Sequence, residues 1–188
     1  MSCYLQEGGL KAIFPVRPSQ IDRLMKGAVA AAGQVGFQPG RIDHRFGAVM
    51  KPDGTPIYLA TWVQSPVEDR WTGGFYTEMG HTVLHGTVTT DPRAGTMETS
   101  AKLDIGGSTV VEASWTIRGP AAGSDPMNVA GMMVRLTITN AGPHDADCLK
   151  SCLTLHAPEC VPLVAGSESR TVACAAAVAA SCLVNCRC

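Results

Sequence analysis

HTVLHGTVTTDPRAGTMETSAKLDIGGSTVVEASWTIR, residues 81–118, contains three runs of β-favouring residues separated by two turn sequences. The turns are residues 91–95, which hold Pro and Gly, and Gly106-Gly107. In residues 109–117 apolar side chains alternate with polar ones, which places them on opposite faces of a strand. The stretch therefore predicts a meander of antiparallel strands with one face turned toward a core.

Further strands are expected on both sides of this meander. Residues 46–50, 57–63 and 75–79 come before it, and residues 133–139 follow after a Gly- and Pro-containing loop. Pro52 and Gly54 separate the first two strands and suit a turn, because Pro presets φ and Gly accepts a positive value.

One strand and one helix are predicted ahead of the sheet. Residues 10–14 form the strand, and Ser19 is the N-cap of a helix that ends at Gly36. Its apolar residues recur at helical spacing: Ile21, Leu24, Met25, Ala28, Ala32 and Val35.

The last part of the chain predicts two short helices. Asp145 or Asp147 caps the first, which must end near Pro158 because Pro disfavours the α conformation in the residue before it. Ser167 or Ser169 caps the second, which runs to about residue 185. We divide the chain into an antiparallel α+β domain, residues 1–141, and a cysteine-rich segment, residues 142–188.

Seven of the eight cysteines lie in this segment, and six of them have symmetric spacing about residue 167. A chain that folds back there would bring together three pairs: Cys148 with Cys186, Cys152 with Cys182, and Cys160 with Cys174. The C-x3-C steps put Cys148 and Cys152 on one helix face, and likewise Cys182 and Cys186. This arrangement looks like that of disulfide-stapled helical hairpins.

Cys3 and Cys188 are the remaining pair. Two alternatives to disulfides stay open, namely buried free thiols and a metal–thiolate site. Zinc is the weaker metal candidate because C-x2-C steps do not occur, whereas Cu(I) would accept a stripe of thiolates.

Glu78, His81 and His85 are the densest group of titratable residues. The surrounding Thr and Val favour a strand, in which the two histidines share a face about 13 Å apart, too far for one metal ion. They could line a cavity with one histidine as a general base. The alternative is an exposed or hydrogen-bonded pair.

Composition excludes some function classes. The net charge of −1 gives no basic surface for a nucleic acid. No apolar run reaches the roughly 18 residues of a membrane span. Met1–Gly9 is polar, unlike a signal peptide, while the cysteine content suggests an oxidising or extracellular setting, so the compartment stays unknown.

The sequence favours a protein that is not an enzyme. It contains no P-loop, dinucleotide fingerprint, H-E-x-x-H or G-x-S-x-G motif. We expect no cofactor and assign no metal ligands.

The predicted fold class is α+β. An antiparallel β-meander sheet packs against one N-terminal helix, and a cysteine-rich helical hairpin follows. This element order resembles the helix-grip arrangement of the Bet v 1/START-like superfamily, which implies a curved sheet and a terminal helix around an apolar cavity.

Three functions compete. The first is a non-catalytic structural, assembly or binding module with a cysteine-stapled tail, which associates with itself or with another protein. The second is a cavity protein that binds, cyclises or isomerises a hydrophobic small molecule. The third is a thiolate metal-binding protein.

Overall fold

A computed structural model describes residues 12–13, 26–30, 42–50, 56–64, 70–119, 133–142, 145–160, 168–184 and 186. Several predicted features lie outside these residues. They are residues 10, 11 and 14 of the first predicted strand, most of the helix at residues 19–36, the turn at Pro52 and Gly54, the predicted cap Ser167, and Cys3 and Cys188.

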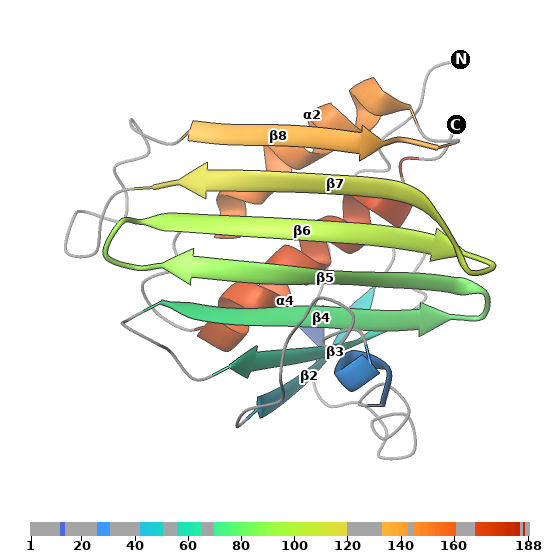
Figure 1. Ribbon diagram of the computed structural model, residues 1–188, viewed down its shortest axis with the longest axis horizontal. Coiled ribbons are helices and arrows are strands. Elements are labelled where there is room, and N and C mark those ends of the chain that lie inside the picture. Colours follow the sequence, from blue (N-terminus) through green and yellow to red (C-terminus); the bar gives the residue numbers. More distant parts are fainter. Residues whose placement is uncertain are drawn as a thin grey trace.

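The strands form one eight-stranded antiparallel sheet in chain order, as Figure 1 shows. Each strand pairs with the next along the chain, which confirms the predicted meander. The strands are β1 (Ala12–Ile13), β2 (Ile42–Met50), β3 (Pro56–Gln64), β4 (Trp71–Met79), β5 (Thr82–Asp91), β6 (Thr96–Ile105), β7 (Ser108–Arg118) and β8 (Met133–Asn140).

The hairpin turns follow from local chemistry. Gly106 and Gly107 have φ angles of 60° and 84°, so both adopt the left-handed conformation that a two-residue hairpin loop requires. Gly80, with φ of 63°, turns the chain from β4 into β5. The prediction that β5 begins at His81 is therefore wrong by one residue, because His81 belongs to this turn.

The C-terminal helices are α2 (Ala146–His156), the 3₁₀ turn η2 (Ala157–Cys160), α4 (Glu168–Ala179) and the π-helical segment η3 (Ala180–Val184). Asp145 caps α2 as predicted: its Oδ1 accepts hydrogen bonds from the backbone N–H groups of Asp147 and Cys148, at 2.8 and 3.0 Å. The α-helix ends at His156, two positions before Pro158.

These helices cover one face of the sheet (Figure 1). Alternate residues of each strand face these helices. Among them, Phe75, Leu84, Leu103 and Trp115 are buried beneath the helical layer. The predicted boundary at residue 141 falls between β8 and α2, and a single cluster of buried residues includes side chains from both sides of it. From the tail this cluster takes Leu149, Cys152, Leu153, Val172, Ala176, Ala179, Cys182 and Leu183.

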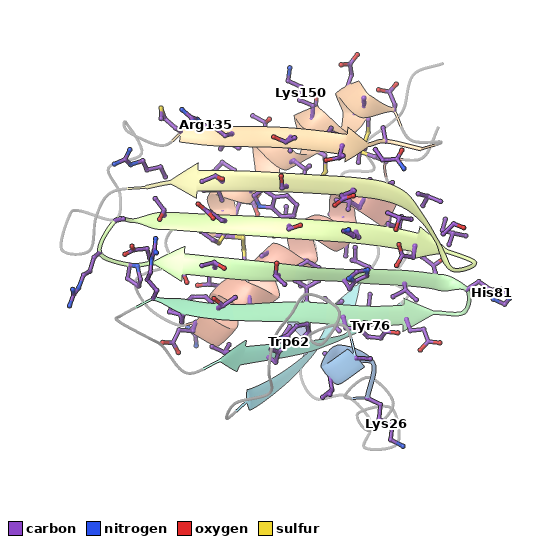
Figure 2. The ribbon with its side chains drawn as sticks, in the orientation of Figure 1. Lys26, Trp62, Tyr76, His81, Arg135 and Lys150 are labelled. Carbon is purple, nitrogen blue, oxygen red and sulfur yellow. A yellow bond between two sulfur atoms is a disulfide. The ribbon has the colours of Figure 1, made fainter. Side chains whose placement is uncertain are left out.

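The helical residues 26–30 lie on the opposite face of the sheet. A Cβ added to Gly27 would meet the ring of Tyr76, which Figure 2 labels beside this helix. The described part of the chain therefore contains the predicted contact between the sheet and an N-terminal helix.

Within the described residues, no helix combines the length and apolar character that crossing a membrane requires.

Candidate functional site

Three disulfides tie the helical layer together. They join Cys148 to Cys186, Cys152 to Cys182 and Cys160 to Cys174, the pairs that the symmetric spacing predicts. The first two bridges connect α2 to η3 and the residues after it, so that these segments run in opposite directions. The third bridge connects η2 to α4. The tail is therefore cysteine-stapled.

Cys182 and Cys186 lie one turn apart on one side, as predicted, although the helix type differs. Cys182 belongs to the π-helical segment η3 and Cys186 follows its end, and the Cys186 backbone N–H donates to the Cys182 carbonyl at 3.1 Å, the i→i−4 bond of one helical turn. The bridges to Cys148 and Cys152 place both sulfurs against α2.

The bridges lie inside the hydrophobic core. Cys152, Cys160 and Cys182 are fully buried, and Cys148 and Cys186 are nearly so. Because a bridged sulfur is not a thiolate, these six cysteines cannot supply the thiolate metal site of the third functional hypothesis, which is wrong for them. Within the described residues, no three His, Cys, Asp or Glu side chains are grouped so that they could hold a metal ion.

The three titratable candidates are only partly brought together. Glu78 on β4 and His85 on β5 share the face opposite the C-terminal helices, as diagonal neighbours about 7–8 Å apart. His81 is exposed in the Gly80 turn and does not join them. The prediction that both histidines lie on one strand face is therefore wrong.

Asp104 on β6 is the partner of His85 that sequence reasoning missed. Nε2 of His85 lies 3.1 Å from Oδ2 of Asp104. The register places His85 opposite Tyr76 on one side and Lys102 on the other, while Asp104 stands opposite Val83. The contact is thus diagonal, and only the β5–β6 register could have identified it. A carboxylate that orients an imidazole is an arrangement suited to general-base chemistry.

Across β5 to β8 the outer face is largely polar, whereas on β3 and β4 it carries Ala60, Trp62 and Tyr76. Lys102 Nζ lies 3.1 Å from Glu112 Oε1, continuing the charged row across β6 and β7. Toward the other end of the strands the face carries hydroxyl side chains, among them Thr72, Thr87, Thr89, Ser100, Ser114, Thr116 and Thr137. Figure 2 shows this face turned toward the viewer.

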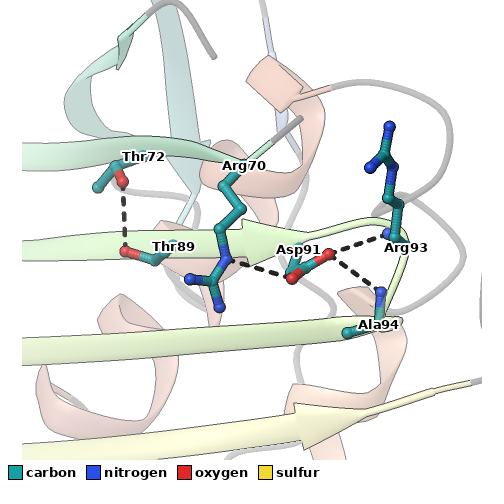
Figure 3. A network of polar contacts seen from close by, with 6 residues as sticks. All are labelled: Arg70, Thr72, Thr89, Asp91, Arg93 and Ala94. Atoms are coloured by element: carbon teal, nitrogen blue, oxygen red, sulfur yellow. Dashed lines mark hydrogen bonds and ion pairs between the residues drawn. The ribbon is translucent and has the colours of Figure 1, made fainter. Parts of the chain in front are cut away.

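A polar network closes the β5–β6 turn (Figure 3). Arg70 Nε donates to Asp91 Oδ2 at 3.2 Å, and Asp91 Oδ1 accepts from the backbone N–H groups of Arg93 and Ala94 at 3.1 and 3.0 Å. The hydrogen bond from Ala94, helped by the positive charge of Arg70, lowers the pKa of the Asp91 carboxyl. These bonds fasten a turn, and we assign them a structural role.

Three buried polar atoms sit on the inner face of the sheet without a hydrogen-bond partner among the described residues: Thr90 Oγ1, Thr99 Oγ1 and Trp115 Nε1. Thr99 on β6 pairs with Trp115 on β7 and with Val88 on β5. Thr90 lies two residues after Val88 on β5, so it is a diagonal neighbour of Thr99. An unsatisfied buried polar group costs about 1–3 kcal/mol. Among the described residues, these three atoms are the unpaired polar atoms that the inner face of the sheet buries.

Comparison with known proteins adds no family: no family model, no curated protein and no solved structure matches the chain. The resemblance to helix-grip proteins therefore stays a prediction based on element order.

Proposed function

We propose that this chain is a non-catalytic structural module that associates with other copies of itself and works in an oxidising environment. The observation that carries the proposal is the helical layer, which three disulfides tie together and which packs against one face of the sheet through a shared hydrophobic core. Among the described residues, the helical segment 26–30 lies against Tyr76 on the opposite face, and we assign the rest of that face to a partner.

Close packing beneath the helices supports this function over a cavity protein. A Cβ added to Gly73 would lie 2.7 Å from Cγ2 of Val172 on α4, so strand and helix approach without spare volume. Phe75, Leu84, Leu103 and Trp115 are all fully or almost fully buried there. A ligand large enough to fill a hydrophobic cavity would need this core to open.

The position of the histidines also weighs against cyclase or isomerase chemistry between sheet and helices. His85 faces away from the helical layer, and His81 lies in a turn. The His85–Asp104 pair is therefore interpreted as part of the polar outer face, where it ties β5 to β6.

Native sizing tests the proposal. Sedimentation or light scattering across a wide concentration range should show reversible association of the oxidised protein. A monomer at every concentration would contradict the proposal.

The buried polar group of Thr90, Thr99 and Trp115 favours a second candidate function. A small molecule with a hydrogen-bond acceptor for the indole N–H could satisfy all three groups at once. Native mass spectrometry of the purified protein tests this candidate, since a bound molecule would appear as a mass adduct that is lost on denaturation.

A further inference from the structure

The six bridged cysteines differ in their exposure to solvent. Five of them are buried, with at most 8% of their surface exposed. Cys174 is the exception, because it is only half-buried at the edge of the core. Its partner Cys160 is fully buried. The Cys160–Cys174 bridge therefore has one end in the core and the other end within reach of solvent.

Cys174 lies on the solvent-facing side of α4. Residues 170, 173, 174 and 177 are exposed or half-buried, whereas residues 171, 172, 175, 176, 178 and 179 are buried. Steps of three and four residues define one face of a helix. Ala173 and Ala177 flank Cys174 on this face, and their side chains are too small to cover a sulfur atom. Because a cysteine has only Cβ and Sγ beyond its backbone, the exposed surface of Cys174 belongs mainly to these two atoms.

Charge as well as burial protects the next most exposed cysteine. Cys148 is 8% exposed, and its backbone N–H donates to Oδ1 of Asp145 at 3.0 Å. Asp147 is its neighbour in the chain. Disulfide exchange begins with the attack of a thiolate on a sulfur atom, and two carboxylates close to Cys148 repel that anion.

We propose that Cys174 is a site of thiol–disulfide exchange with small thiols in solution. The attacking thiolate forms a mixed disulfide with the Cys174 sulfur, while Cys160 leaves as a thiolate and takes up a proton from water. A second thiolate then attacks the small-thiol sulfur of the mixed disulfide and releases Cys174. The bridge gains two electrons, and two small thiol molecules are oxidised to their disulfide. This modification does not depend on the proposed self-association.

The helical layer stays in place when this bridge opens. Val172, Ala175 and Ala176 hold α4 in the core, and the other two bridges still tie α2 to the end of the chain. The two free thiols are separated by only 14 residues in sequence, which keeps their effective concentration high. The exchange is therefore reversible, and the disulfide of the small thiol restores the bridge.

Reduced glutathione is the probe for this exchange. The oxidised full chain is incubated with it under native conditions, quenched with an alkylating agent and mapped by mass spectrometry. We expect Cys160 and Cys174 to react first, with any glutathione adduct on Cys174, and the other two bridges to open at least about tenfold more slowly. The proposal is overturned if another bridge opens first, if all three open together, if the adduct is on Cys160, or if no bridge opens in the folded protein.

Cys160→Ser and Cys174→Ser are matched variants, because each leaves one thiol of the pair free. Under native conditions the free Cys174 of C160S should be alkylated at least about tenfold faster than the free Cys160 of C174S. Circular dichroism and mapping of the two remaining bridges check that both variants are folded. Equal rates, or a faster reaction of Cys160, would contradict the proposal. If either variant does not fold, the glutathione experiment on the unaltered chain decides.

Discussion

Cys152 and Cys182 join the middle of α2 to η3, with their Cα atoms 5.6 Å apart and both side chains fully buried. The bridge closes a loop with a sequence separation of 30 residues. It therefore fixes two segments that each contribute Leu side chains to the core beneath the sheet.

Loss of this bridge should destabilise the protein substantially. For the double variant C152A/C182A we expect the free energy of unfolding to fall by about 2–3 kcal/mol, because the intact Cys148–Cys186 bridge already restricts most of this loop in the unfolded chain. Denaturant titration gives the value. C160A/C174A is the comparison, and its 14-residue loop predicts a loss of similar size, about 3 kcal/mol. A C152A/C182A variant as stable as the wild type would refute a structural role for the bridge.

Replacing the buried hydroxyl of Thr99 should change the free energy of unfolding, and the direction of the change shows whether the hydroxyl has a binding partner. Because Oγ1 has no partner among the described residues, the isosteric change Thr99→Val should raise the free energy of unfolding by about 1–2 kcal/mol. Thr77 is just as buried but does have an interaction partner, so Thr77→Val should lower it by about 1 kcal/mol. A loss of stability in T99V would instead indicate an occupant that binds the hydroxyl, as the second candidate function requires.

The lowered pKa of Asp91 predicts that the stability of the folded protein depends on pH. Its folded-state pKa is lowered, first by the Ala94 N–H and then by Arg70, so its carboxylate stabilises the folded state fully above the ordinary aspartate pKa of about 4. That contribution declines as the pH falls through the lower folded-state pKa. Thermal unfolding should show D91N less stable than the wild type at neutral pH and equal to it in strong acid. A difference that persists unchanged in acid would contradict this role.

Gly86 tests the packing of the core. A Cβ at this position would lie 2.9 Å from Cε1 of Phe75 and closer still to the Phe75 Cζ and the Ser100 carbonyl oxygen. Gly86→Ala should therefore lower the free energy of unfolding by about 1–3 kcal/mol. Thr87→Ala, on the opposite face, is the control. An equally stable or more stable G86A would show that the core has room to adjust.

Local sequence was sufficient for much of the fold. The alternation and turn residues predicted β6 with its observed bounds, and Asp145 was correctly predicted as an N-cap. β4, in contrast, begins at Trp71 and not at residue 75. Gly73 and Gly74 favour a turn on local grounds. In the fold they pair with β3 and β5 as part of the strand, and glycine is needed there because Val172 and the Trp62 ring occupy the space of a Cβ.

The candidate site was less predictable, because its contacts depend on register. The spacing of the cysteines predicted three bridges, since symmetry about one turn is visible in the chain itself. The His85–Asp104 contact joins residues 19 apart on neighbouring strands, and no local pattern marks it. The π-helical end of the last helix, Ala180–Val184, likewise follows from no local pattern.

The most direct test of the disulfide-locked helical layer is peptide mapping of the unreduced, alkylated protein by mass spectrometry. We predict peptides linked through Cys148–Cys186, Cys152–Cys182 and Cys160–Cys174, with these six thiols unalkylated until a reductant is added. Alkylation of these cysteines without reduction, or links between other pairs, would contradict the account.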